Sequence, residues 1–324
     1  MLIFLIFFMD LLKFGVSALM SPFSPPLVQD SGYAGNHYSL VQTIHGVKTF
    51  AHKQTGQWLH GQVGPVREAQ DLYVHPSGIA HTSLEKVVIY DVGMGCAGQV
   101  LASWEAFRQN PLLKSLHVVS FDLDHLGLVA ILENLEHMPH AIPYSESIQN
   151  LISSHEIVVH EPHQKTFKWT FLPGDFPEVL KEQRAYLEKH PAHHIFYDFF
   201  SPSVHPHLWH SSVFRSLYQL CCRVHGGQLY TYCSATAVRA SLLAAGFYVG
   251  YGSASGTNKT TTLAHTHLEA LQNPLTLRWK ATFENSTKPY VPGEPESEHV
   301  QSRLISHPQW LHPSTQDTTT KVLR

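Results

Sequence analysis

The chain lacks a long apolar segment, an excess of basic charge and any C-x-x-C cysteine pair. Its formal charge of −3 gives no global attraction to nucleic acid, so such a partner would have to meet a local patch. The four cysteines form no C-x-x-C pair and three lie in apolar or glycine-turn contexts, which favours a reduced cytoplasmic protein over a disulfide framework. The pure apolar run, residues 1–9, is shorter than the roughly 20 residues that span a bilayer, so we expect no membrane anchor.

Histidine, by contrast, is abundant, with 25 residues. Histidines gather at 190–194, 205–210 and 265–267, a spacing that could be drawn as a metal site. Carboxylates that would support such a site are not evident, and histidines are scattered over the whole chain. We therefore predict no metal and read the histidines as a composition bias.

Apolar, β-branched runs alternate with segments of helical spacing from Lys86 onward. This rhythm predicts the α/β class, with a doubly wound, mostly parallel sheet that binds ligands at the carboxyl ends of its strands. The expected strands lie in 86–92, 116–122, 167–175, 193–202, 226–234 and 248–254.

We expect four parts in the chain. Residues 1–36 read as a leader, although translation could also begin at Met9 or Met20. In 37–82, two alternating runs joined by a His-Gly turn predict a β-hairpin, followed by a helix from Val66, as an N-terminal extension or lid. The main domain is 83–274. Residues 275–324, rich in Pro, Ser and Thr, read as a partly disordered tail with one short helix near "ESEHVQSRLIS".

The first expected strand ends in "YDVGMGCAG", a G-x-G-x-x-G turn that both dinucleotide oxidoreductases and methyltransferases use. Gly93 and Gly95 allow a ligand to approach the backbone closely. Asp91 would repel a pyrophosphate, whereas it suits the cationic amine of an amino-acid ligand. S-adenosylmethionine carries that amine and no phosphate. The alternative, in which Asp91 only caps the following helix, stays open.

Two further expected strands also end in acids. Asp122 directly ends the second strand, where a carboxylate can accept both ribose hydroxyls of a nucleoside cofactor; Asp124 could instead cap the next helix. Asp175, in "LPGDF", could accept a hydrogen bond from an adenine amino group or could cap the helix that follows.

The fourth strand end, "IFYDFFSP", places Asp198 at the mouth of the sheet with a rigid turn behind it. A methyl acceptor that is an amine must lose a proton, which a carboxylate at Asp198 could take. Phe199 and Phe200 either shape a substrate pocket or belong to the core.

Taken in order, these motifs resemble the methyltransferase module of bacterial MnmC, the tRNA 5-methylaminomethyl-2-thiouridine biosynthesis protein, and stand-alone MnmC-like proteins, over roughly residues 35–265. The most specific features are Asp198 with its Ser201-Pro202 turn and Trp209 downstream. A second specific feature is "YTYCSATAVRASLLAAGFYV", which includes Ser234 and Arg239.

The resemblance implies a class I, Rossmann-like S-adenosylmethionine-dependent fold, with 83–274 as the methyltransferase domain, and methylation of an aminomethyl group on the wobble uridine of tRNA in the cytoplasm. A separate enzyme would then supply the aminomethyl precursor. The resemblance also implies roles for the cofactor residues: Asp91, Gly93 and Gly95 at the methionine end, Asp122 at the ribose and Asp175 at the adenine. Asp198 would face the acceptor amine. The expected substrate residues are Phe199, Phe200, Ser201, Pro202, Trp209, Ser234, Arg239 and Lys259.

Three other functions use a similar glycine turn or fold. The same cofactor could serve a small amine or hydroxyl substrate. Met94 and Cys96 in the turn leave open a non-catalytic methyltransferase fold that serves as a binding protein. NAD-dependent oxidoreduction is disfavoured by Asp91 ahead of the glycines and by the lack of a Tyr-x-x-x-Lys pair.

Overall fold

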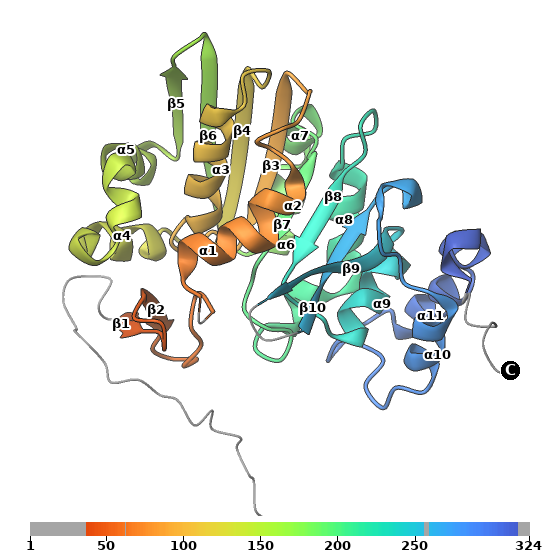
Figure 1. The fold of residues 1–324 in the computed structure, drawn as a ribbon. Coiled ribbons are helices and arrows are strands. Elements are labelled where there is room, and N and C mark those ends of the chain that lie inside the picture. The colour runs from red at the N-terminus through yellow and green to blue at the C-terminus, as the bar shows by residue number, and fades with distance from the viewer. Residues whose placement is uncertain (1–36, 62, 256–258, 317–324) are drawn as a thin grey trace, which may run out of the picture.

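A sheet of eight strands forms the centre of the protein, seen in a computed structural model that describes residues 37–61, 63–255 and 259–316 (Figure 1). The leader expected at 1–36 lies outside the described residues. The strand order is β5-β6-β4-β3-β7-β8-β10-β9. The strands are β3 (Lys86–Val92), β4 (Ser115–Asp122), β5 (Glu156–Glu161), β6 (Lys165–Pro173), β7 (His194–Tyr197), β8 (Gln228–Thr231), β9 (Tyr248–Ser255) and β10 (Lys259–His265).

The five central strands, from β6 to β8, are parallel to one another, and antiparallel pairs occur at both edges. The chain runs outward from β3 through β4 to β6 and then returns to β7 on the other side of β3. Strand order therefore reverses between β3 and β7, which is where ligands bind in such sheets. The predicted doubly wound, mostly parallel sheet is confirmed. Strands β5 and β10 were not predicted.

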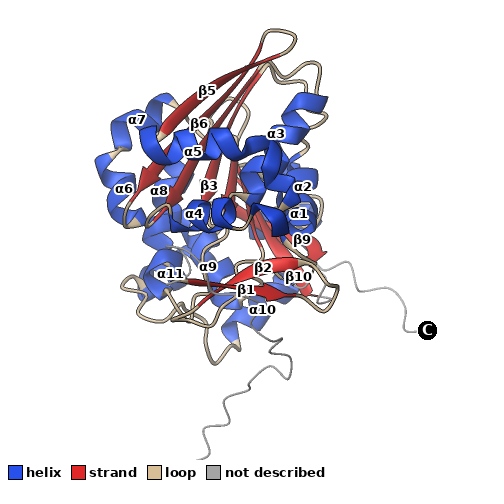
Figure 2. Ribbon diagram, turned by 90° about the vertical axis from the view of Figure 1, so that its left-hand side faces the viewer, coloured by secondary structure: helices blue, strands red, loops and turns tan. Residues whose placement is uncertain are grey.

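Helices cover both faces of the sheet (Figure 2). Side chains alternate between the two faces along each strand, and both faces carry apolar side chains that the helices bury. In β3, Val87 and Ile89 pack with the first helical layer, whereas Tyr90 and Val92 pack with the second. The first layer contains α3 (Gly98–Gln109), α4 (Leu126–Glu133) and α5 (Ser145–Ser154). The second contains α6 (Phe176–Glu182), α7 (Arg184–Lys189), α8 (Ser211–Leu220) and α9 (Thr236–Ala245).

The N-terminal hairpin of β1 (Tyr38–Gln42) and β2 (Lys48–His52) forms as predicted. It lies beside the carboxyl ends of the central strands (Figure 1), and the Gln57 amide donates to Ser201 Oγ at 3.2 Å. The expected helix from Val66 is an irregular segment: α1 (Pro65–Ala69), a π-helical turn (Gln70–Val74) and α2 (His75–Ser77). The extension thus reaches the edge where the site is expected. Domain boundaries at 82 and 274 stay predictions.

The short helix expected near "ESEHVQSRLIS" forms, but the expectation that the rest of the segment is a tail is wrong for residues 275–316. Two helices, α10 (Leu277–Glu284) and α11 (Ser297–Ile305), pack against α9, and Trp279 and Trp310 are buried in the core. The pattern misled because the buried side chains stand singly among Pro, Ser and Thr residues. Residues 317–324 lie outside the described residues.

Two buried polar side chains fix this C-terminal segment. Gln309 accepts a hydrogen bond from Val249 N–H at 2.8 Å and donates to the carbonyls of Val249 and Leu275, so its amide covers the edge of β9 as a further strand would. Glu294 accepts hydrogen bonds from the backbone N–H and the hydroxyl of Ser211, at the start of α8. The segment therefore belongs to the folded unit.

Candidate active site

The glycine turn after β3 presses against the loop after β7. Gly93 has φ +86°, and a Cβ there would lie 2.9 Å from the carbonyl carbon of Asp198, so a side chain would force the two segments apart. Gly127 of α4 packs as tightly on the other side, where a Cβ would lie 2.0 Å from the carbonyl oxygen of Gly95. A Cβ at Gly95 itself, by contrast, would meet open space. The turn therefore has open space at Gly95, beside the Asp198 loop.

Asp91 is 1 % exposed and does not cap α3, so the capping alternative is wrong. Ser120 Oγ donates to Asp91 Oδ2 at 2.7 Å, and Trp169 Nε1 donates in turn to that hydroxyl. Asp91 Oδ1 is buried without a partner. Burial raises the pKa of Asp91 to about 7. A carboxylate oxygen left unpaired in a dry setting fits a cationic amine.

Asp122 ties the end of β4 to the glycine turn. Its carboxylate accepts hydrogen bonds from Gly95 N–H at 2.9 Å and from Leu123 N–H at 2.8 Å. Burial raises the pKa of Asp122 to about 6, while the two backbone donors oppose that rise. Each oxygen keeps a lone pair for a hydroxyl. Asp124 instead accepts a hydrogen bond from the N–H of Leu126, the first residue of α4, although the N-cap position of that helix is His125 and not Asp124.

Asp175 occupies the N-cap position of α6 but makes no capping hydrogen bond with its side chain. Its carboxylate is exposed and lies 3.7 Å from His207 Nε2. The side chain therefore remains available to a ligand at the end of β6.

Asp198, directly after β7, is held by residues that the sequence did not single out. Tyr73 OH donates to Asp198 Oδ1 at 2.7 Å, and the amide of Gln99 donates to Oδ2. Burial, followed by the negative charge of Glu68, raises the pKa of Asp198 well above its ordinary value. Asp198 is thus a half-buried carboxylate with two buried donors, directly after β7 at the carboxyl edge of the sheet.

The two phenylalanines after Asp198 point to different surroundings. Phe199 packs on Phe176, with ring centroids 5.4 Å apart, and contributes to the second core layer. Phe200 lies 5.7 Å from His52 of the hairpin, so it belongs to the mouth of the site rather than to the core. Ser201 and Pro202 are half-buried in the same loop.

Two predicted substrate residues are corrected to supporting roles. Trp209 is fully buried, and its Nε1–H donates to the carbonyl of Phe200 at 3.0 Å, so it braces the loop from behind. Arg239 is 6 % exposed, and its guanidinium donates to Thr262 Oγ1 and to the carbonyl of Thr261, which binds α9 to β10. Neither side chain is free to contact a substrate.

Ser234 is half-buried after β8, at the carboxyl edge, and stays a prediction. Lys259 begins β10, but its side chain lies outside what the structure describes. Met94 and Cys96, which suggested a degenerate turn, are buried in the first core layer and leave the space at Gly95 clear.

Metal-binding groups, membrane-spanning helices and disulfides can be assessed only in the part of the chain that the structure describes. Within 37–61, 63–255 and 259–316, no three His, Cys, Asp or Glu side chains are grouped so as to hold a metal ion. In the same part of the chain, every helix is too short or too polar to cross a bilayer. The four cysteines are free and buried.

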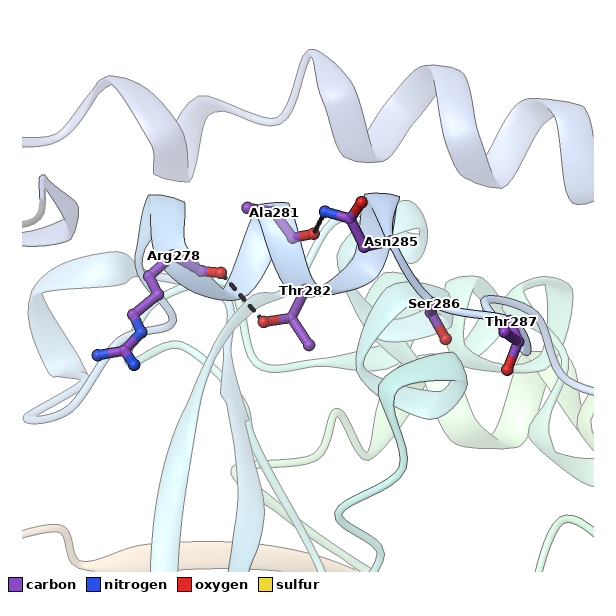
Figure 3. Close-up of a pocket in the computed structure, with 6 residues that line it drawn as sticks. All are labelled: Arg278, Ala281, Thr282, Asn285, Ser286 and Thr287. Carbon is purple, nitrogen blue, oxygen red and sulfur yellow. Dashed lines mark hydrogen bonds between the residues drawn. The ribbon is translucent and has the colours of Figure 1, made fainter.

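A separate depression of about 660 Å³ runs along α10 (Figure 3). Thr282 and Asn285, which line it, donate to the carbonyls of Arg278 and Ala281 in their own helix. These two side chains are thus engaged within α10, and the depression shares no residue with the predicted site. The carboxyl edge of the sheet remains the candidate active site.

Comparison with known proteins agrees with this geometry. The family model described as S-adenosyl-L-methionine-dependent methyltransferase matches residues 143–267. The bifunctional protein MnmC of Delftia acidovorans, described as acting in tRNA 5-methylaminomethyl-2-thiouridine biosynthesis, is 27% identical over 201 residues, 60% of this chain and 30% of that protein. Its counterpart in Ectopseudomonas mendocina is 30% identical over 171 residues, 51% of this chain and 24% of that protein. The chain thus spans less than a third of these relatives.

The crystal structure of MnmC2 from Aquifex aeolicus superimposes with a TM-score of 0.60 and 24% identity, over 83% of this chain and 84% of that one. This likeness shows the shared fold. Fold, glycine turn and family match together place the chain in the class of S-adenosyl-L-methionine-dependent methyltransferases. Within that class it is similar to the MnmC-like methyltransferases, as the strand-end motifs predicted.

Proposed function

We propose that the chain is an N-methyltransferase that acts on the aminomethyl group of 5-aminomethyl-2-thiouridine at the wobble position of tRNA. The observation that carries the proposal is Asp198: its carboxylate, held by Tyr73 and Gln99, has a raised pKa, and its backbone carbonyl packs against Gly93 of the glycine turn at the carboxyl edge of the sheet. An aminomethyl nitrogen must shed a proton to become a nucleophile, and a base of raised pKa is well matched to an amine. The names of the relatives support tRNA as the acceptor.

We propose that the cofactor lies along the carboxyl ends of β3, β4 and β6. The unpaired Asp91 Oδ1 would accept the amine of the methionyl part, the Gly93–Gly95 backbone would face it, Asp122 would accept the ribose hydroxyls and Asp175 the adenine amino group. Bound S-adenosylmethionine supplies an electrophilic methyl group on a sulfonium. Asp198 would take the proton that the acceptor nitrogen must lose before it attacks, and the new C–N bond would form as the bond from the methyl carbon to the sulfonium sulfur breaks.

Phe200, at the mouth, would contact the acceptor base, and the hairpin would exclude water from it. Ser201, Pro202 and Ser234 would line the same acceptor side. The enzyme would act in the cytoplasm, where a separate enzyme must supply the aminomethyl precursor.

A methyl-transfer assay tests the class of acceptor. Purified protein is given labelled S-adenosylmethionine with either tRNA that carries the precursor or a set of small primary amines. We expect label in tRNA only, with an apparent tRNA affinity that falls steeply as salt rises, because phosphate contacts release counterions. Label in the small amines, with no salt dependence, would contradict the proposal. Binding of S-adenosylmethionine without transfer to any acceptor would indicate a binding protein.

A further inference from the structure

Each carboxylate oxygen of Asp198 has one hydrogen-bond donor, and the donors come from two separate segments. Tyr73 belongs to the π-helical turn before β3, and Gln99 to the first turn of α3. Both donors are buried, at 0 % and 3 % exposure, whereas Asp198 is half-buried. Two donors on opposite oxygens fix the plane of the carboxylate and leave a lone pair on each oxygen for another partner.

We infer that Tyr73 and Gln99 are positioning residues that fix the carboxylate of Asp198 and present its remaining lone pairs to the acceptor amine. The inference rests on the proposed function, in which Asp198 takes the proton of that amine. It assigns to the N-terminal extension a part in the reaction, beyond that of a cover over the site.

The backbone of the extension is built to deliver the Tyr73 hydroxyl. The N–H of His75 bonds to the carbonyl of Gln70, which widens the turn, and three consecutive residues, Leu72 to Val74, are buried. The Tyr73 ring packs on Phe196, with centroids 5.4 Å apart, in the strand that ends just before Asp198. Ring and hydroxyl are thus anchored to the same segment, which sets the hydroxyl against the carboxylate.

The charges around Asp198 explain why it needs two donors. Glu68 from α1 and Asp91 from β3 both raise the pKa of Asp198, in addition to burial. Tyr232 also faces it, and burial raises the pKa of that phenol, so it stays neutral. The hydrogen bonds of Tyr73 and Gln99 act in the opposite direction and lower the pKa of Asp198. Loss of either donor therefore leaves more of Asp198 protonated and unable to accept a proton at a given pH.

Three variants test the inference: Tyr73→Phe, Gln99→Met and a matched control, Tyr90→Phe. Tyr90 is equally buried, and its hydroxyl donates to the carbonyls of Leu187 and His190 far from Asp198. The pKa of Asp198 is followed by carbon NMR of protein labelled at the aspartate carboxyl groups, with Asp198→Asn to identify its signal. This measurement needs no substrate, and melting curves of each variant verify its folding.

We expect the Asp198 titration to move up by about one pH unit in Tyr73→Phe and in Gln99→Met, since a hydrogen bond to a charged group has about that effect, and not to move in Tyr90→Phe. With tRNA as acceptor, kcat at neutral pH should fall about tenfold, KM should change less than about twofold, and the acid limb of the pH profile should move with the NMR titration. If Tyr73→Phe does not fold, Gln99→Met carries the same test.

The outcomes separate the two proposals. An unmoved Asp198 titration in folded variants, alongside methyl transfer to tRNA by the unmodified protein, would overturn the inference alone. A shifted Asp198 titration without methyl transfer to tRNA would support the positioning role of Tyr73 and Gln99 and would overturn tRNA as the proposed acceptor.

Discussion

The two ends of the parallel strands carry opposite chemistry. At the carboxyl ends, burial raises the pKa of Asp91 to about 7 and of Asp122 to about 6, and it also raises the pKa of Asp198 well above its ordinary value. At the amino ends lie histidines whose pKa burial lowers: His117 and His194 to about 3, and His193 and His265 to about 4. One end holds acids that resist ionisation, and the other holds bases that stay neutral.

The difference lies in how the polar groups are partnered. The histidines have local partners: His193 Nδ1 accepts from Val88 N–H, and His194 Nδ1 lies 3.2 Å from the hydroxyl of Tyr230. Asp91 keeps an unpaired oxygen instead. Buried polar groups with partners serve stability, whereas a buried group left unpaired marks a place where a ligand completes the structure. His193 and His194, buried with partners at the amino end, are thus structural.

The largest expected effect comes from Asp198→Asn, which removes the base and keeps the shape of the site. Methyl transfer to tRNA should fall about 10²- to 10⁴-fold, the range of general base catalysis, while S-adenosylmethionine binding stays within about twofold. Steady-state kinetics and calorimetry measure the two quantities. Asp71→Asn, in an exposed pair with Arg67, is the matched control. Full activity in Asp198→Asn would contradict the claim that the acids at the carboxyl ends of the strands carry out the reaction.

Next in size is Asp91→Asn, which should change binding and stability in opposite directions. S-adenosylmethionine affinity should fall at least about tenfold, because the charge opposite the amine is lost. The folded pKa of Asp91 is raised above its unfolded value, so its contribution to stability is present below pH 4 and is lost as pH rises through about 7. The ligand-free variant should therefore be more stable at pH 8, by about 1–3 kcal/mol.

Chemical unfolding at pH 8 and pH 5 tests this claim, since the gain should shrink at the lower pH. A variant that is less stable at both values would show that the Asp91 charge serves the fold and not a ligand.

The smallest effect belongs to the amino end, in His194→Gln. The folded pKa of about 3 lies below the ordinary 6.5, so the unfolded chain binds a proton that the folded chain does not, and stability falls as pH drops below 6.5. The variant should lose about 1–2 kcal/mol less than the unmodified protein between pH 7 and pH 5. Urea unfolding at the two values measures the difference, with the exposed His81→Gln as control. Reduced methyl transfer by His194→Gln at pH 7 would contradict the claim that the histidines at the amino ends of the strands take no part in the reaction.

The carboxyl edge was predictable because each of its acids follows an apolar run, a pattern that parallel sheets turn into a shared edge. Asp91, Asp122 and Asp198 illustrate this. Tyr73 was not predictable, since its place depends on a π-helical turn and on a partner 125 residues away. Trp209 was misassigned because the sequence does not reveal whether a side chain contacts a loop from the side of the core or from the side of the ligand.

The C-terminal segment was misread for a related reason. The side-chain amide of Gln309 bonds the backbone at the edge of β9, where a neighbouring strand would otherwise bond. Glu294 accepts from the first N–H of α8, which begins 83 residues earlier in the chain. Both are long-range polar contacts, which leave no periodic pattern in the sequence.

Nucleoside analysis tests the central claim most directly. tRNA that carries 5-aminomethyl-2-thiouridine is incubated with S-adenosylmethionine and either the unmodified protein or Asp198→Asn, then digested and resolved by chromatography with mass detection. The account predicts conversion to the 5-methylaminomethyl nucleoside by the unmodified protein and almost none by the variant. An unchanged nucleoside profile with the unmodified protein, under conditions where it binds S-adenosylmethionine, would contradict it.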